Sequence, residues 1–92
     1  MEKYLLTIKE NTLETYKHLT DKEYMDVMED MAINYAEGLS YENINLHIQV
    51  SYDNHIDFIS ESTTYETVKK AKETLESYFK DYITVSIIKQ PL

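Results

Sequence analysis

Apolar and polar side chains alternate along four stretches of the chain, a period that predicts β-strands with one buried and one exposed face. The alternation is cleanest over residues 44–52, where isoleucine, leucine and valine take every second position from 44 to 50. Asp53 and Asn54 suit a hairpin turn, so the next stretch should return beside this one. The predicted strands are residues 3–9, 44–52, 55–61 and 82–89.

Two other stretches show the helical period, and both begin with a capping signal. Thr20 is followed three residues later by Glu23, and Thr63 is followed in the same way by Glu66. This spacing is that of a capping box, which satisfies backbone N–H groups at a helix N-terminus. Gly38 is the only glycine of the chain and suits the position just past a helix end. We therefore expect helices over residues 20–38 and 63–80.

The order of these elements is βαββαβ, which predicts an α+β fold in a single domain, residues 1–92. Such an order suits a two-layer sandwich, an antiparallel sheet with two helices on one face, as in ferredoxin-like domains. Residues 11–19 fit either a further strand or an irregular loop. A strand there would give the alternative order ββαββαβ, built from two ββα units.

The net charge narrows the classes of function more than the rest of the amino-acid composition does. The 92 residues hold 17 acidic residues and 9 lysines, a net charge of −8, with no arginine and no cysteine. Proteins that bind nucleic acid directly usually carry a basic surface with arginine, so direct binding of nucleic acid is disfavoured. No apolar run approaches the ~20 residues of a membrane span, and no secretory signal is recognisable. A cytoplasmic protein without disulfides is expected.

Side chains that could carry catalysis are present, but not in a catalytic pattern. None of His18, His47 and His55 has a partner at a metal-binding spacing, and no serine lies in a nucleophile motif. His55 and Asp57 would share one side of a strand, where the polar face of a hairpin explains them better than a site does. A small-ligand sensor around His47 ranks lowest among the functions considered. The sequence thus predicts no catalytic residue, no metal site and no cofactor.

The first predicted helix carries the densest negative charge. Residues 21–37 hold six acidic residues and one lysine, a net charge of −5. With about 100° of rotation per residue, Tyr24, Met28 and Tyr35 form the core stripe and the acidic residues lie opposite. Like charges one turn apart repel, whereas the second helix carries pairs of opposite charge at that spacing. These pairs are Glu66–Lys70, Lys69–Glu73, Lys72–Glu76 and Glu76–Lys80.

Ile33 is the exception on this acidic face. It lies about 180° from Tyr24 on the helical projection, beside the carboxylates and away from the core. An apolar residue within a charged surface is a common arrangement at a protein interface. Tyr41 and Tyr52, near the predicted turns, are further contact candidates. The predicted partner-binding residues are Glu23, Asp26, Glu29, Asp30, Ile33, Glu37 and Tyr41.

In size, charge and layout the whole chain resembles the small, acidic inhibitors that phages encode against host enzymes, such as anti-CRISPR proteins and other DNA mimics. That resemblance implies a non-enzymatic inhibitor that docks its acidic helix on the basic, nucleic-acid-binding surface of a host or defence protein. Carboxylates one helical turn apart, about 5–6 Å, can stand in for phosphates. The alternative is a homo-oligomeric ferredoxin-like module. It would form a homodimer through its final strand, with Tyr82 and Ile88 on the contact face.

Overall fold

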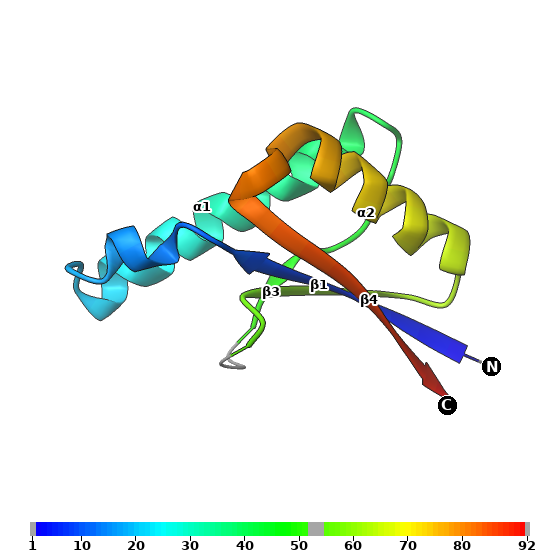
Figure 1. Ribbon diagram of the computed structural model, residues 1–92, viewed down its shortest axis with the longest axis horizontal. Coiled ribbons are helices and arrows are strands. Elements are labelled where there is room, and N and C mark those ends of the chain that lie inside the picture. The colour runs from blue at the N-terminus through cyan, green and yellow to red at the C-terminus, as the bar shows by residue number, and fades with distance from the viewer. Residues whose placement is uncertain (1, 52–54, 92) are drawn as a thin grey trace.

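A computed structural model describes residues 2–51 and 55–91 of the chain. Figure 1 shows two helices lying on one side of a four-stranded sheet. In chain order the elements are β1 (Glu2–Glu10), the 3₁₀ turn η1 (Leu13–Tyr16), α1 (Asp21–Ser40), β2 (Gln49–Val50), β3 (Phe58–Ser62), α2 (Tyr65–Phe79), the 3₁₀ turn η2 (Lys80–Tyr82) and β4 (Ile83–Pro91).

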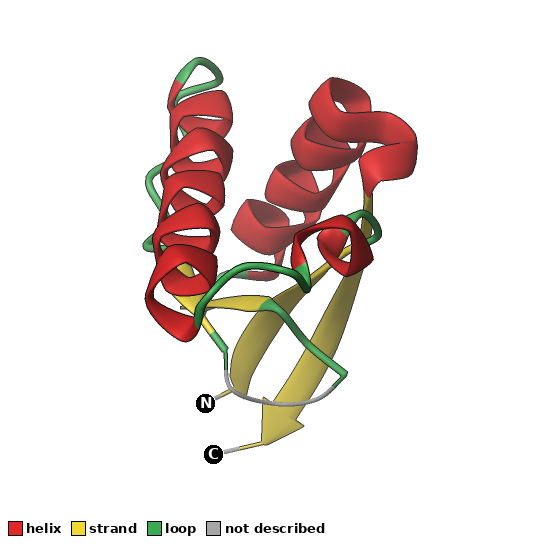
Figure 2. Ribbon diagram, turned by 90° about the vertical axis from the view of Figure 1, so that its left-hand side faces the viewer, coloured by secondary structure: helices red, strands yellow, loops and turns green. Residues whose placement is uncertain are grey.

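The strands form one antiparallel sheet in the order β2-β3-β1-β4. Both helices pack on the same face, and within residues 2–51 and 55–91 no element covers the opposite face (Figures 1 and 2). The βαββαβ order and this strand order define a ferredoxin-like α+β fold, as the sequence predicts. Residues 11–19 contain the turn η1 instead of a strand, so the alternative ββαββαβ order is wrong.

The long strand β1 is central, paired with β3 on one side and with β4 along its whole length on the other. Its alternate residues Leu6 and Ile8 face the helices and are fully buried. Leu5 and Thr7 point to the uncovered face and are also buried, because cross-strand neighbours flank them on both sides. Glu10 continues the inner series of β1 and is buried as well.

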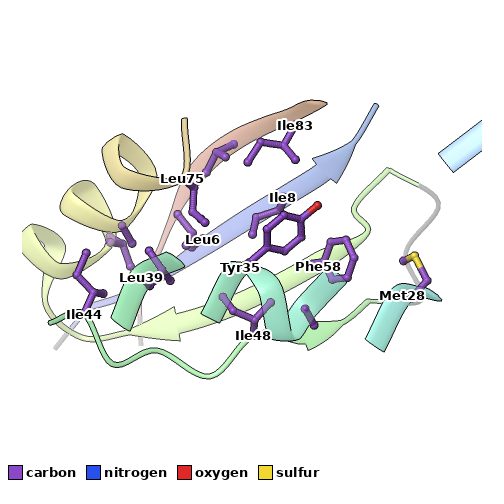
Figure 3. Close-up of a cluster of buried hydrophobic side chains, with 14 of the residues drawn as sticks. Leu6, Ile8, Met28, Tyr35, Leu39, Ile44, Ile48, Phe58, Leu75 and Ile83 are labelled. Atoms are coloured by element: carbon purple, nitrogen blue, oxygen red, sulfur yellow. The ribbon is translucent and has the colours of Figure 1, made fainter. Parts of the chain in front are cut away.

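The core lies between the sheet and the two helices. Figure 3 shows the Tyr35 ring of α1 among core side chains that include Ile8 and Phe58. This ring meets Phe58 and Phe79 edge-on, with ring centroids 5.0 and 4.9 Å apart. Edge-on contacts suit the aromatic quadrupole and add to the stabilisation from burial. The helix α2 contributes Val68, Ala71 and Leu75, all fully buried.

The two predicted capping boxes have different outcomes. At α1 the Thr20 hydroxyl accepts a hydrogen bond from the Glu23 N–H, and the Glu23 carboxylate accepts one from the Thr20 N–H, so this box is confirmed. At α2 the prediction is wrong. The N-cap residue is Thr64 in place of the predicted Thr63, and the Thr64 side chain makes no capping hydrogen bond. The Thr64 N–H donates to the Ser62 hydroxyl.

The predicted end of α1 is also wrong, because Gly38 lies inside the helix with a negative φ. The turn comes instead at Asn43, whose φ of 59° is in the left-handed region. Here the Ile44 N–H donates to the Leu39 carbonyl and the Asn43 N–H to the Ser40 carbonyl, both at 3.0 Å. Leu39 and Ile44 are both buried. These bonds and this apolar pair form a Schellman motif.

The strand predicted over residues 44–52 forms only in part. Gln49 and Val50 pair with β3, whereas residues 44–48 run beside the sheet without regular pairing. Ile44 and Ile48 are nevertheless buried. The alternating pattern therefore reports which side chains enter the core, and not which backbone groups pair. The predicted turn at residues 53–54 lies outside the described residues, and the strand after it begins at Phe58.

The position of the Schellman motif predicts opposite effects for two alanine substitutions. Gly38→Ala should raise the free energy of unfolding by about 0.5–1 kcal/mol, because the helix interior favours alanine. A Cβ at Gly38 would meet Phe79 at 3.4 Å, ordinary contact. Asn43→Ala should lower the free energy of unfolding by about 1 kcal/mol, since alanine tolerates a positive φ poorly. Urea denaturation measures both changes in the free energy of unfolding. A loss of stability in Gly38→Ala and a gain in Asn43→Ala would place the helix end at Gly38.

Candidate functional site

The orientation of α1 is fixed by a buried polar contact. Tyr35, 2% exposed, donates its hydroxyl hydrogen bond to Glu10 Oε2 at 2.5 Å. The other oxygen of this carboxylate accepts hydrogen bonds from the Thr12 N–H and hydroxyl. Burial, followed by the bond to Glu10, raises the pKa of the Tyr35 hydroxyl well above its usual value. A rotation of α1 about its axis would break this contact, so the helix presents one defined face to solvent.

That outward face carries six of the seven residues predicted to bind a partner, and the seventh, Tyr41, follows the helix end. Each of them is exposed, with Ile33 at 55% and Tyr41 at 77%. Ile33 is therefore exposed, and an apolar side chain does lie beside the carboxylates at the protein surface. We call this surface the acidic face; it consists of Glu23, Asp26, Glu29, Asp30, Ile33 and Glu37 of α1, with Tyr41 just beyond the helix end.

The carboxylates of the acidic face are not paired with lysine side chains in the described part of the chain. Within residues 2–51 and 55–91, no ion pair includes a carboxylate of α1. Glu23 differs from the others because it belongs to the capping box. Its hydrogen bonds with the Thr20 side chain and backbone hold the pKa of its carboxyl below the usual value. On α2, by contrast, Lys72 and Glu76 form an ion pair at 2.6 Å.

Ile33 also lines a groove that the sequence does not predict. The groove lies between one flank of α1 and residues 46–50, and has a volume of about 500 Å³. Its α1 wall consists of Met25, Glu29, Ala32, Ile33 and Ala36. Two of these, Glu29 and Ile33, belong to the acidic face as well. The groove and the acidic face are thus adjoining parts of one surface, and we call this groove the α1–β2 groove.

The opposite wall of the groove is a sheet edge, because β2 is the outermost strand. The Ser51 N–H donates to the Asp57 carbonyl at 2.8 Å, and Gln49 lies opposite Ile59 of β3. Backbone groups in an antiparallel pair point alternately toward and away from the partner strand. The N–H and C=O of Val50, between these two positions, therefore point outward from the sheet.

The tyrosines predicted as core or contact residues have mixed outcomes. Tyr35 is buried and Tyr24 half-buried, as expected for the core stripe. Tyr78 lies three residues after Leu75, a helical spacing that predicts a core-facing side chain. It is instead exposed and donates a hydrogen bond to the Glu42 carboxylate. The Tyr78 position corrects the prediction, since α2 turns this ring toward the turn after α1. The contact candidate Tyr52 lies outside the described residues.

A second pocket, of about 590 Å³, opens beside Glu10 and Asp57. Its carboxylates already have protein partners. Glu10 is bound by Tyr35 and Thr12, while Asp57 accepts the Glu10 N–H at 2.7 Å and lies 3.7 Å from the Lys9 ammonium. We interpret this cluster as structural, because it ties the end of β1 to α1 and to the residue before β3.

The groups that could carry other chemistry are dispersed. In the part of the chain that the structure describes, no cluster of three or more histidine, cysteine or acidic side chains is arranged to hold a metal ion. His18, His47 and His55 are all exposed. Neither described helix is long and apolar enough to cross a membrane.

Fold and surface together define the class: a ferredoxin-like α+β domain with an acidic helix beside an uncovered sheet edge. No protein-family model matches the chain, and a search of curated proteins finds no match.

The buried Tyr35 hydroxyl predicts a sensitivity to alkaline pH. In the unfolded chain this group titrates near 10.0, and in the folded protein its pKa is raised. The resulting stabilisation is complete below pH 10 and is lost as the pH rises toward the folded pKa. Urea denaturation of the wild type should therefore show the free energy of unfolding falling above pH 10, by up to about 1.4 kcal/mol per pH unit from this group.

Tyr35→Phe removes that group and isolates its effect. The variant should lose about 1–3 kcal/mol at pH 7, because the buried Glu10 carboxylate loses a donor. Above pH 10 its stability should fall less steeply than that of the wild type. Tyr41→Phe, at an exposed ring, should leave stability at pH 7 unchanged. Equal slopes for wild type and Tyr35→Phe would contradict the role given to the buried hydroxyl.

Proposed function

We propose that this domain is a non-enzymatic binding protein that docks its acidic face on a basic surface of a partner protein, inhibiting the partner. The basic surface is one that otherwise binds nucleic acid. The observation that carries the proposal is the exposed, unpaired charge of α1: its carboxylates form no ion pair among the described residues.

This charge distribution lowers the stability of the helix and favours association. Asp26 and Asp30 lie one turn apart, and such like-charged pairs cost a few tenths of a kcal/mol. A basic partner would remove that repulsion and would be attracted over a distance of about 8–10 Å at physiological salt. Ile33 would supply apolar contact at the centre of the charged surface, where desolvation strengthens the surrounding ion pairs.

Reversing two charges tests this proposal. In a pull-down from bacterial lysate, Asp26→Lys with Asp30→Lys should reduce capture of the partner about tenfold or more. Stability should be unchanged or slightly higher, because a repulsive pair is removed. Duplex DNA should displace the partner from the wild-type domain, and added salt should weaken capture.

The matched control carries the same change of charge on the other helix. Glu66→Lys with Glu73→Lys alters two exposed residues of α2 that form no ion pair among the described residues. This variant should capture the partner as the wild type does. The proposal is wrong if both double variants capture the partner to the same extent, or if duplex DNA fails to displace the partner.

A second candidate function, self-association, is favoured by the uncovered side of the sheet. β4 is an edge strand of nine residues whose outer edge pairs with no described strand. Ile88, 43% exposed, lies opposite Leu5 on the face without helices. Tyr82, predicted to lie in this strand, is exposed within the preceding turn η2.

Light scattering separates the two candidates. If β4 is a dimer interface, Ile88→Lys should convert a dimer into a monomer, because a charge would replace apolar contact. Ile33→Glu should leave such a dimer intact. A monomeric wild type, or a dimer that Ile33→Glu alone dissociates, would exclude the β4 interface.

A further inference from the structure

We propose that the partner docks an extended segment into the α1–β2 groove, where it adds a strand to the outer edge of β2. The segment carries an apolar side chain flanked by lysine or arginine. This inference rests on the proposed function and specifies how the acidic face recognises its partner. It concerns one occupant, a basic extended segment of a protein, bound by backbone pairing on one wall and by side chains on the other.

The backbone of the β2 wall is available for such pairing. Val50 directs its N–H and C=O away from β3, as the alternation between Gln49 and Ser51 requires. The preceding residues 45–48 make no backbone–backbone hydrogen bond to another described residue. Exposed edges of this kind recognise extended peptides through main-chain hydrogen bonds, with alternate side chains entering pockets.

The α1 wall supplies the pocket for an apolar side chain. Ala32 and Ala36 are small and leave room, while Met25 and Ile33 provide apolar surface beside them. From residue 25 to residue 36 the helix rises about 16 Å, and residues 46–50 extend over about 13 Å. The groove therefore matches roughly four or five residues of an extended chain.

Charge complementarity selects the flanking residues of the bound segment. Glu29 lines the groove, and Asp26 and Asp30 lie on the adjoining acidic face. A lysine or arginine beside the apolar anchor can lay its aliphatic stem over Ile33 and place its charge among these carboxylates. Acidic segments would be repelled, so the groove distinguishes basic from acidic extended segments.

A designed peptide tests strand addition directly. The peptide Thr-Lys-Thr-Ile-Thr-Lys-Thr, acetylated and amidated, places isoleucine and two lysines on one side of an extended chain. Titration into isotopically labelled protein, followed by NMR, measures its Kd. The control peptide has the same sequence with N-methyl groups on the fourth and fifth residues, one on each edge of the extended chain, which keeps the charge but disrupts strand pairing in either direction. The control should bind at least tenfold more weakly.

The protein variants separate the groove from charge alone. Ile33→Asp adds a negative charge but removes the apolar contact, and should weaken peptide binding at least tenfold. Ile88→Asp makes the same change on the uncovered sheet face and should leave binding unchanged. The amide hydrogens of Ile48 and Val50 should exchange with solvent more slowly when the peptide is bound.

Each contrary result has a distinct meaning. Strand addition is wrong if the methylated peptide binds equally well, if Ile33→Asp tightens binding, or if no peptide binds at about 1 mM. If only the charge reversal Asp26→Lys with Asp30→Lys weakens binding, the acidic face acts without the groove and the proposed function still stands. If that reversal has no effect while methylation and Ile33→Asp do, the groove binds peptides and the proposed acidic docking fails.

Discussion

The hydrogen bond from the buried Tyr35 hydroxyl to Glu10 is the contact on which the arrangement of this protein depends. It joins the middle of α1 to the end of the central strand, while the same ring meets Phe58 of β3 and Phe79 at the end of α2. A buried carboxylate with its donors in place is stable, but the loss of one donor is costly. This geometry sets the rotation of α1, and so determines which side chains form its outer surface.

The outer surface has two adjoining parts that share Glu29 and Ile33. One part is the row of exposed carboxylates along α1, and the other is the groove against the edge of β2. The acidic part would attract a basic partner over a distance, and the groove would hold an extended segment in one register. The position of Ile33 beside acidic residues has an explanation in this account: it lies where the two parts meet.

The sequence predicted the order of elements well because it depends on local signals. Strong alternation marks β1 and β4, and the Thr20–Glu23 capping box marks the start of α1. The errors arose where a local signal has more than one structural use. Gly38 lies within α1 with a negative φ, and Asn43 supplies the left-handed turn that glycine usually provides. The spacing of Leu39, Asn43 and Ile44 is the signal that could have located the true helix end.

The acidic face followed from the helical period alone, whereas the groove depends on how distant segments meet and has no local signal. Labelling of carboxyl groups with a carbodiimide and an amine, read by mass spectrometry, tests the central claim in the complex with the captured partner. The account predicts that the partner protects Asp26, Glu29 and Asp30 from labelling and leaves Glu66 and Glu73 of α2 as reactive as in the free domain. Unchanged labelling of the α1 carboxylates in the complex would contradict it.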